Sequence, residues 1–155
     1  MTKYRIESDS VGEKQVPVNA YYGVQSLRAH ENFRITGKTI HPEMIRALAE
    51  IKKAAAITNM EIELLNKEKG DAIIKACDEI TDPIQGGAGT SINMNINEVV
   101  ANRATEILGG KLGDYSYVHP NDHVNYGQST NDVIPSSGKI AAIRLLDKAL
   151  PQLDN

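Results

Sequence analysis

Apolar residues recur along most of the chain at intervals of three and four positions, the spacing that gathers side chains on one face of an α-helix. This spacing predicts helices over five stretches: 24–33, 42–69, 71–80, 90–108 and the residues beyond Pro135. Residues 4–19 alternate only loosely, with a turn at Val11-Gly12 and with Pro17 limiting strand pairing. We therefore expect a mainly α-helical fold with a short, irregular or weakly β-like N-terminal arm.

The longest predicted helix begins at Pro42, because proline suits the first helical position, and it runs without Gly or Pro to Lys69. We expect Gly70 to end it. Its expected buried stripe comprises Met44, Leu48, Ile51, Ala55, Thr58, Ile62 and Leu65. The shorter helix after it is expected to bury Ile73, Cys77 and Ile80 on its apolar side.

The last predicted helix has an apolar face that nothing else in the sequence is expected to cover. Beyond Pro135 that face comprises Ile140, Ile143, Leu146, Leu150 and Leu153. The helical spacing is still present when the chain stops at Asn155, where a cap and a turn would normally follow. We interpret this segment as a helix that is cut short, with an apolar face that lies exposed or contacts another molecule.

Composition narrows the class of protein. A content of 41% hydrophobic and 24% charged residues over 155 positions is ordinary for one globular domain. The 17 basic and 20 acidic residues are well mixed, so nothing favours binding to nucleic acid or to a membrane surface. The sequence has no apolar run of membrane-spanning length, and its first residues, MTKYRIESDS, lack the apolar stretch expected of a signal peptide. Cys77 is the only cysteine, which excludes an internal disulfide and a thiolate metal cluster and favours a cytoplasmic location.

A glycine-rich stretch leads into the helix that begins near Thr90. Its glycines, Gly86, Gly87 and Gly89, allow a backbone to approach a ligand closely. Four asparagines follow inside the helix: Asn93, Asn95, Asn97 and Asn102. Asparagine is a poor helix former, so these amides either face water or build a buried polar network. The stretch is neither a phosphate loop nor a dinucleotide fingerprint, because it lacks the required lysine and the preceding strand.

Residues 118–137, VHPNDHVNYGQSTNDVIPSS, contain almost no side chain that could build a core. They predict a polar loop that runs into a helix N-terminus. Such a helix end presents unpaired backbone N–H groups and a positive dipole end, both of which suit a bound carboxylate. The alternative is an ordinary loop before a capped helix, because Ser, Thr, Asn and Asp are also the usual capping residues.

Together, GAGTSINMNINEVVANRA and VHPNDHVNYGQSTND resemble the first two motif regions of the fumarase/aspartase superfamily, and its aspartate ammonia-lyase branch most closely. VPVNAYYGVQSLRAHENF resembles the opening of the same family, so the resemblance covers nearly the whole chain. It implies a helical N-terminal lyase domain, here residues 1–134. It also implies the truncated start of a central helical-bundle domain, here 135–155, which packs into a homotetramer in that family.

The resemblance implies a reaction and a set of binding residues. The family eliminates ammonia from L-aspartate to give fumarate, without an organic cofactor or a metal ligand set among these residues. By motif, Thr90, Ser129 and Thr130 match ligands of the substrate carboxylate that gains charge as the C3 proton leaves. Hydroxyl donors at helix starts suit that task. Asn131, together with Thr90 and Ser129, matches the residues that bind the amino group of the substrate in that family.

A second anion site is also implied by the resemblance. His119, Asn121 and Asp122 match a loop that forms such a site in the related fumarases. The sequence departs from that pattern at Ser116, where those enzymes tend to have arginine. A lone loop histidine is otherwise more often a hydrogen-bonded surface residue than a ligand.

The family's third motif, a GSS-x-MPxKxN loop with the serine that resembles the general base, does not occur in these residues, and neither does the central-domain histidine. We therefore expect no catalytic residue in this chain, which would be an inactive N-terminal fragment of an aspartate ammonia-lyase. The alternatives are a class II fumarase and a helical interaction module without chemistry. Thr90 and Ser129 are 39 positions apart in the sequence. A substrate-binding protein requires both at one pocket, whereas an interaction module does not.

Overall fold

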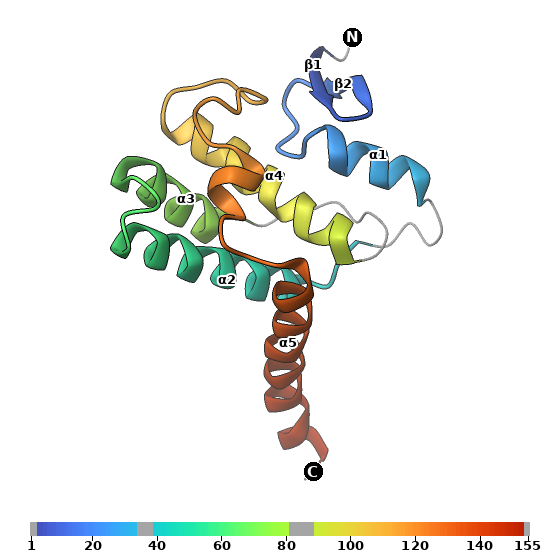
Figure 1. The fold of residues 1–155 in the computed structure, drawn as a ribbon. Coiled ribbons are helices and arrows are strands. Elements are labelled where there is room, and N and C mark those ends of the chain that lie inside the picture. Colours follow the sequence, from blue (N-terminus) through green and yellow to red (C-terminus); the bar gives the residue numbers. More distant parts are fainter. Residues whose placement is uncertain (1–2, 34–38, 81–88, 154–155) are drawn as a thin grey trace.

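The computed structural model describes residues 3–33, 39–80 and 89–153 (Figure 1). Its elements, in chain order, are β1 (Tyr4–Asp9), β2 (Gly12–Pro17), α1 (Val24–Asn32), α2 (Pro42–Glu61), α3 (Lys67–Glu79), α4 (Gly89–Ile107), the π-helix η1 (Pro120–Val124) and α5 (Thr130–Leu153). The fold is therefore mainly helical, as the sequence predicts. None of the described helices is long and apolar enough to cross a membrane.

The predicted β-like arm is an antiparallel hairpin. Strand β1 pairs with β2 in a register that runs from Tyr4 opposite Pro17 to Asp9 opposite Gly12. The side chain of Asp9 accepts the backbone N–H groups of Val11 and Gly12, which closes the turn. Gly12 has a φ of 129°, a conformation that favours glycine. Pro17 lies at the far end of the ladder, in agreement with its expected effect on pairing.

The core lies among α2, α3 and α4, where α2 and α3 lie side by side and α4 packs across them (Figure 1). Leu48, Ile73, Ile96 and Val100 are fully buried there. Ile73 and Cys77 of α3 are both buried, as predicted, whereas Ile80 follows the end of the helix and is only half-buried. Helix α1 packs against α4 on the opposite side from α2 and connects the hairpin to the core.

The predicted single helix over 42–69 is wrong. Helix α2 ends at Glu61, the chain turns with Glu63 at a positive φ of 61°, and α3 begins at Lys67 behind Asn66, whose side chain caps it. Gly70, which we expected to end the long helix, lies inside α3. A Cβ at Gly70 would be 2.1 Å from the sulfur of Met60, so this glycine permits close packing of α3 on α2.

The turn also changes which face of α2 is buried. Thr58 and Ile62, both predicted to be buried, are exposed; Ile62 keeps 56% of its surface. Leu48 is buried as predicted, but much of the remaining buried face differs from the expected stripe and includes Ile45, Ala49, Lys52, Ala56 and Asn59. Because alanine is common around this helix, the helical spacing of apolar residues does not distinguish which of two neighbouring faces is buried.

Helix α5 begins five residues earlier than the expected start at Pro135. Ser129 precedes its first residue, and its carbonyl accepts the N–H groups of Asp132 and Val133. Pro135 therefore lies in the second turn, where its missing N–H removes one backbone bond near the helix end. The predicted start at Pro135 is wrong because a proline is tolerated in the first turns of a helix as well as at its first position.

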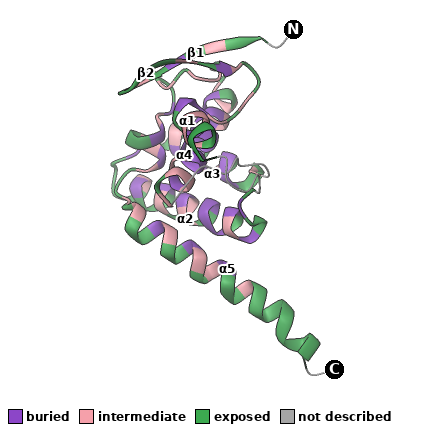
Figure 2. Cartoon of the chain, turned by 90° about the vertical axis from the view of Figure 1, so that its right-hand side faces the viewer, coloured by how far each residue is buried: buried purple, intermediate pink, exposed green. Residues whose placement is uncertain are grey.

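Beyond its first turns, α5 projects away from the rest of the molecule (Figure 1), and its outer half is largely exposed (Figure 2). Arg144 and Lys148 tie it to Glu50 and Glu43 of α2. The exposed apolar face that the sequence predicts is present except at Ile140, which is half-buried: Leu146 keeps 55% of its surface and Leu153 80%. Ile143 and Leu150 lie on the same exposed side.

Candidate functional site: two adjoining helix N-termini

The N-terminal ends of α4 and α5 lie against each other. The side-chain amide of Asn93, in the first turns of α4, donates a hydrogen bond of 3.1 Å to the hydroxyl of Thr130, the first residue of α5. Gly89 packs against Ile134 closely enough that a Cβ there would lie 3.2 Å from the Ile134 side chain. The positive dipole ends of two helices thus meet within one chain, an arrangement that favours an anion between them.

The structure places the four predicted substrate ligands at these two helix ends. Thr90 is the second residue of α4 and is exposed, whereas Ser129, Thr130 and Asn131 form the start of α5. Ser129 and Asn131 are exposed and Thr130 is half-buried. The Ser129 hydroxyl accepts the N–H of Asn131 at 3.2 Å. Gly86 and Gly87, predicted to approach a ligand, lie outside the described residues.

A series of hydrogen bonds between buried polar side chains supports the two helix ends on the side of α2. Lys52 of α2, fully buried, donates to the side-chain oxygen of Asn125 at 2.7 Å, and Asn93 donates to the same oxygen at 3.1 Å. The amide nitrogen of Asn125 in turn donates to the backbone carbonyl of Gln128. Burial lowers the pKa of Lys52 to about 7. Sequence reasoning missed Lys52 and Asn125; a lysine one turn after Leu48, on the buried side of a helix, was the available signal.

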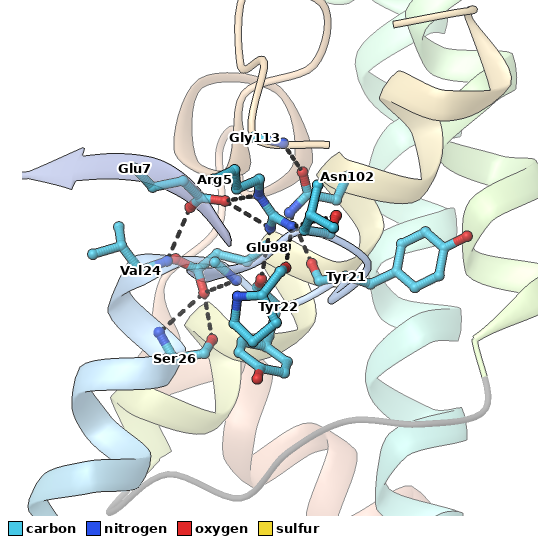
Figure 3. Close-up of polar contacts among 12 residues, drawn as sticks. Arg5, Glu7, Tyr21, Tyr22, Val24, Ser26, Glu98, Asn102 and Gly113 are labelled. Carbon is cyan, nitrogen blue, oxygen red and sulfur yellow. Dashed lines mark hydrogen bonds and ion pairs between the residues drawn. The ribbon is translucent and has the colours of Figure 1, made fainter. Parts of the chain in front are cut away.

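Three of the four asparagines of α4 form buried hydrogen bonds to other elements, Asn97 donates among the described residues only to the sulfur of Met94, and the alternative of a water-facing helix is wrong. Asn93, Asn95, Asn97 and Asn102 are all buried. Asn95 donates to the hydroxyl of Ser26, and Asn102 donates to the carbonyl of Tyr21 and accepts the N–H of Gly113 (Figure 3). These bonds connect α4 to α1, to the segment before it and to the loop that follows α4.

Glu98 of α4 caps the N-terminus of α1 (Figure 3). Its carboxylate accepts the backbone N–H groups of Gly23, Gln25 and Ser26, each at 3.0 Å, and also the Ser26 hydroxyl. Burial raises the pKa of the Glu98 carboxyl, while these hydrogen bonds lower it. No side chain fits at Gly23, because a Cβ there would lie 2.3 Å from the phenol oxygen of Tyr115.

A second buried carboxylate completes this cap. Glu7 of β1 accepts the N–H of Val24 at 2.9 Å and the hydroxyl of Tyr115 at 3.1 Å. Arg5 pairs with Glu7 at 2.7 Å and donates to the carbonyl of Tyr22 (Figure 3). Charged groups thus attach the hairpin to the start of α1.

A hollow of about 560 Å³ lies where the hairpin, α1 and η1 meet, and Arg28, Glu98, His119 and Asn121 are among its lining residues. Asp122, predicted to belong to a second anion site with His119 and Asn121, is not among them. Asp9 also lines the hollow and pairs with Arg28 at 3.0 Å. The charge of Arg28 is therefore balanced locally, which weakens its attraction for an anion.

His119 also has a structural role. Its Nδ1 accepts the N–H groups of Asn121 and Asp122 at 3.2 and 3.1 Å, so it caps η1. This bonding leaves Nε2 as the ring nitrogen available to a ligand. His41 caps α2 in the same way, through the N–H of Glu43, as its position before Pro42 suggests. Within the described ranges, no group of three or more His, Cys, Asp or Glu side chains is arranged to hold a metal ion.

Comparison with known proteins identifies the family. A protein-family model described as "Lyase" matches residues 12–155. The chain is 55% identical to an aspartate ammonia-lyase from Bacillus sp, over 96% of this chain and 34% of that protein. It is 51% identical to a class II fumarate hydratase from Halobacterium salinarum, over 92% of this chain and 32% of that protein. The chain thus spans about a third of the length of these relatives.

A solved structure agrees in fold. The crystal structure described as fumarate lyase:delta crystallin from Brucella melitensis bound to cobalt superposes with a TM-score of 0.91 at 45% identity. The superposition covers 98% of this chain and 36% of that one. The sequence resemblance, the fold and the family match agree, and the chain belongs to the fumarase/aspartase family of lyases.

Proposed function

We propose that the protein containing this chain is an aspartate ammonia-lyase and that the chain forms its N-terminal substrate-binding part. The observation that carries the proposal is the meeting of two helix N-termini that present Thr90, Ser129 and Thr130. The 55% identity to an aspartate ammonia-lyase supports the choice of reaction. A helical interaction module would give these two helix ends no reason to adjoin.

The proposed chemistry is an elimination across C2 and C3 of L-aspartate. A base removes the C3 proton, the electrons of that bond form the double bond of fumarate, and the C2–N bond breaks to release ammonia. Negative charge grows on the carboxylate attached to C3 while the proton leaves. Hydroxyl donors from Thr90, Ser129 and Thr130 would stabilise that charge, each by about 3 kcal/mol on the scale of oxyanion-hole donors. Asn131 would hold the amino group together with Thr90 and Ser129.

The proposal assigns binding, not proton abstraction, to these residues. We place 1–134 in an N-terminal lyase domain and 135–155 at the start of a central bundle domain. The base and the ligands of the other carboxylate would come from the third motif, which this chain lacks, so the chain by itself is expected to be inactive. In a homotetramer, the exposed face of α5 with Leu146 and Leu150 would be covered by neighbouring subunits. The buried free thiol of Cys77 is compatible with the cytoplasm.

A class II fumarase is the second candidate, favoured by the 51% identity to the Halobacterium salinarum enzyme. Both reactions have fumarate as a product or substrate, so one assay separates them. The complete protein is incubated with L-aspartate or with malate, and the absorbance of fumarate is followed. Formation of fumarate and ammonia from L-aspartate supports the proposal. Turnover of malate but not of L-aspartate establishes the fumarase instead.

We further propose that the hollow beside η1 can hold a second anion. His119 Nε2 and the Asn121 side chain would bind it, with Asp122 acting only through η1, since it does not line the hollow. The locally balanced Arg28 and the nearby Glu98 argue for weak binding.

A further inference from the structure

The orientation of the Asn125 side chain is fixed from two sides. Its nitrogen donates to the backbone carbonyl of Gln128 at 3.2 Å, and a carbonyl can only accept. Its oxygen accepts a hydrogen bond of 2.7 Å from Nζ of Lys52, which carries N–H groups whether or not it is charged. An exchanged amide would bring two donors together on one side and two acceptors on the other. The Asn125 oxygen is therefore the acceptor that faces α4.

That acceptor determines the orientation of Asn93. The Asn93 amide nitrogen lies 3.1 Å from the Asn125 oxygen and 3.1 Å from the Thr130 hydroxyl. If the amide were reversed, two oxygens would face each other at that distance. Both hydrogens of the Asn93 amide are thus directed, one to Asn125 and one to Thr130. Asn93 keeps only 3% of its surface exposed, so water does not compete strongly for these bonds.

Thr130 consequently accepts a hydrogen bond on its inner side. A hydroxyl has a single proton to donate, and among the described residues the only hydrogen bond of this hydroxyl is the one it accepts from Asn93. We infer that Asn93 is a positioning residue: it occupies the inner side of the Thr130 oxygen and leaves the hydroxyl proton for the substrate carboxylate. This inference rests on the proposed function, in which Thr130 is a ligand of that carboxylate.

The physical advantage is pre-organisation. A free threonine hydroxyl can turn its proton toward any nearby acceptor, whereas one held by an amide donor presents its proton outward before the substrate arrives. A donor already aimed at a developing charge requires no reorientation during the reaction. Lys52 and Asn93 both donate to the Asn125 oxygen, and the second N–H of the Asn93 amide is thereby directed to Thr130 at the start of α5.

The test is a double-mutant cycle in the complete protein, using Asn93→Leu and Thr130→Val. Leucine has nearly the shape of asparagine but no donor. We expect Thr130→Val to lower kcat about 100-fold, on the scale of lost oxyanion-hole donors, and Asn93→Leu to lower it about 10-fold. In the Thr130→Val background, Asn93→Leu is expected to have no further effect on kcat, since no hydroxyl remains to orient. An equal 10-fold loss in both backgrounds would overturn the inference.

A conservative variant provides an independent measurement. Thr130→Ser keeps the hydroxyl and is expected to stay within about 3-fold of the unaltered kcat, because Asn93 still holds the oxygen. With Asn93→Leu present, the same change is expected to cost about 10-fold, because serine lacks the methyl group that restricts rotation. Equal effects of Thr130→Ser in both backgrounds contradict the inference.

The outcomes separate the inference from the proposed function. Turnover of malate alone would reject the aspartate assignment, and the cycle is then run with malate, so the inference is still tested. A Thr130→Val variant with unchanged kcat and KM would remove Thr130 from the substrate site and overturn the inference with it. Urea unfolding of each variant distinguishes lost orientation from lost folding.

Discussion

The carboxylate of Glu98 accepts the backbone N–H of Gly23 at 3.0 Å across 75 positions of sequence. A helix is usually capped by the residue that precedes it, but Gly23 has no side chain to do so, and α1 takes its cap from α4 instead. One buried side chain therefore both starts α1 and attaches it to the core.

The first prediction concerns this cap. Glu98→Gln keeps the shape but replaces one acceptor oxygen with an NH₂ group that faces backbone donors. We expect the free energy of unfolding to fall by about 2–4 kcal/mol, since buried donors lose a charged partner. Urea unfolding followed by circular dichroism measures this. Glu61→Gln, at an exposed position on α2, is the matched control and is expected to change little. An equal decrease in the free energy of unfolding in both variants would show that the hydrogen bonds of Glu98 to α1 do not stabilise the fold.

The second prediction concerns pH. Burial lowers the pKa of Lys52 to about 7, below its usual value of 10.5, so between these pH values the unfolded chain binds more protons than the folded one. The stability of the protein is therefore expected to rise with pH across this window. The free energy of unfolding is measured at pH 7 and at pH 10. We expect its increase between these two pH values to be about 2–4 kcal/mol smaller in Lys52→Met than in the unaltered protein.

Lys53→Met is the matched control for this experiment. Lys53 is adjacent in sequence, is only partly buried and pairs with Asp78 at 2.7 Å near the surface. Its replacement is expected to shift stability by less than about 1 kcal/mol and to leave the pH dependence intact. A Lys52→Met protein with the same pH dependence as the unaltered one would show that Lys52 stays charged when buried.

The third prediction tests Thr90. Thr90→Val keeps the shape of the side chain and removes its donor. We expect turnover in the complete protein to fall about 100-fold while the free energy of unfolding changes by less than about 1 kcal/mol. Thr58→Val, at an exposed position on α2, is the control. Normal turnover of the Thr90 variant would make its assignment as a substrate ligand wrong.

The fourth prediction separates the two roles of His119. Asparagine can also cap a helix, so His119→Asn is expected to retain most of the stability, whereas His119→Ala is expected to lose about 1 kcal/mol. Both variants lack Nε2. If that nitrogen binds an anion in the hollow, both are expected to weaken binding of a dicarboxylate such as malonate at that second site, measured by calorimetry. Unchanged binding in both would exclude His119 as an anion ligand.

Local patterns in the sequence were enough to predict α1, α4 and the exposed face of α5, whereas for the N-terminus they predicted only an irregular or weakly β-like arm. They also identified the two polar stretches that the fold brings together, because helix starts carry recognisable residues such as Thr90 and Ser129. The boundary between α2 and α3 was missed, because Gly70 marks a close helix contact and Asn66 is the actual cap. A glycine that allows packing and a glycine that ends a helix look the same in one sequence.

The support of the site was harder to predict than its surface. Lys52 and Asn125 are 73 positions apart and meet only through tertiary packing. Sequence reasoning gave two alternatives for the α4 asparagines, and only the fold could decide between them, since periodicity does not say which side of a helix faces a neighbour. The same limit applies to Glu98, a charged residue whose partners lie on another helix.

The contacts between the hairpin and α1 determine where the N-terminal boundary of a shortened protein can lie. The family match begins at residue 12, the first residue of β2. A chain trimmed to that point would lose Arg5 and Glu7, and with them the acceptor for the Val24 N–H and the neighbour of the Tyr115 hydroxyl. The contacts that start α1 thus depend on residues upstream of the region matched by the family model, and truncation designs should retain the first strand.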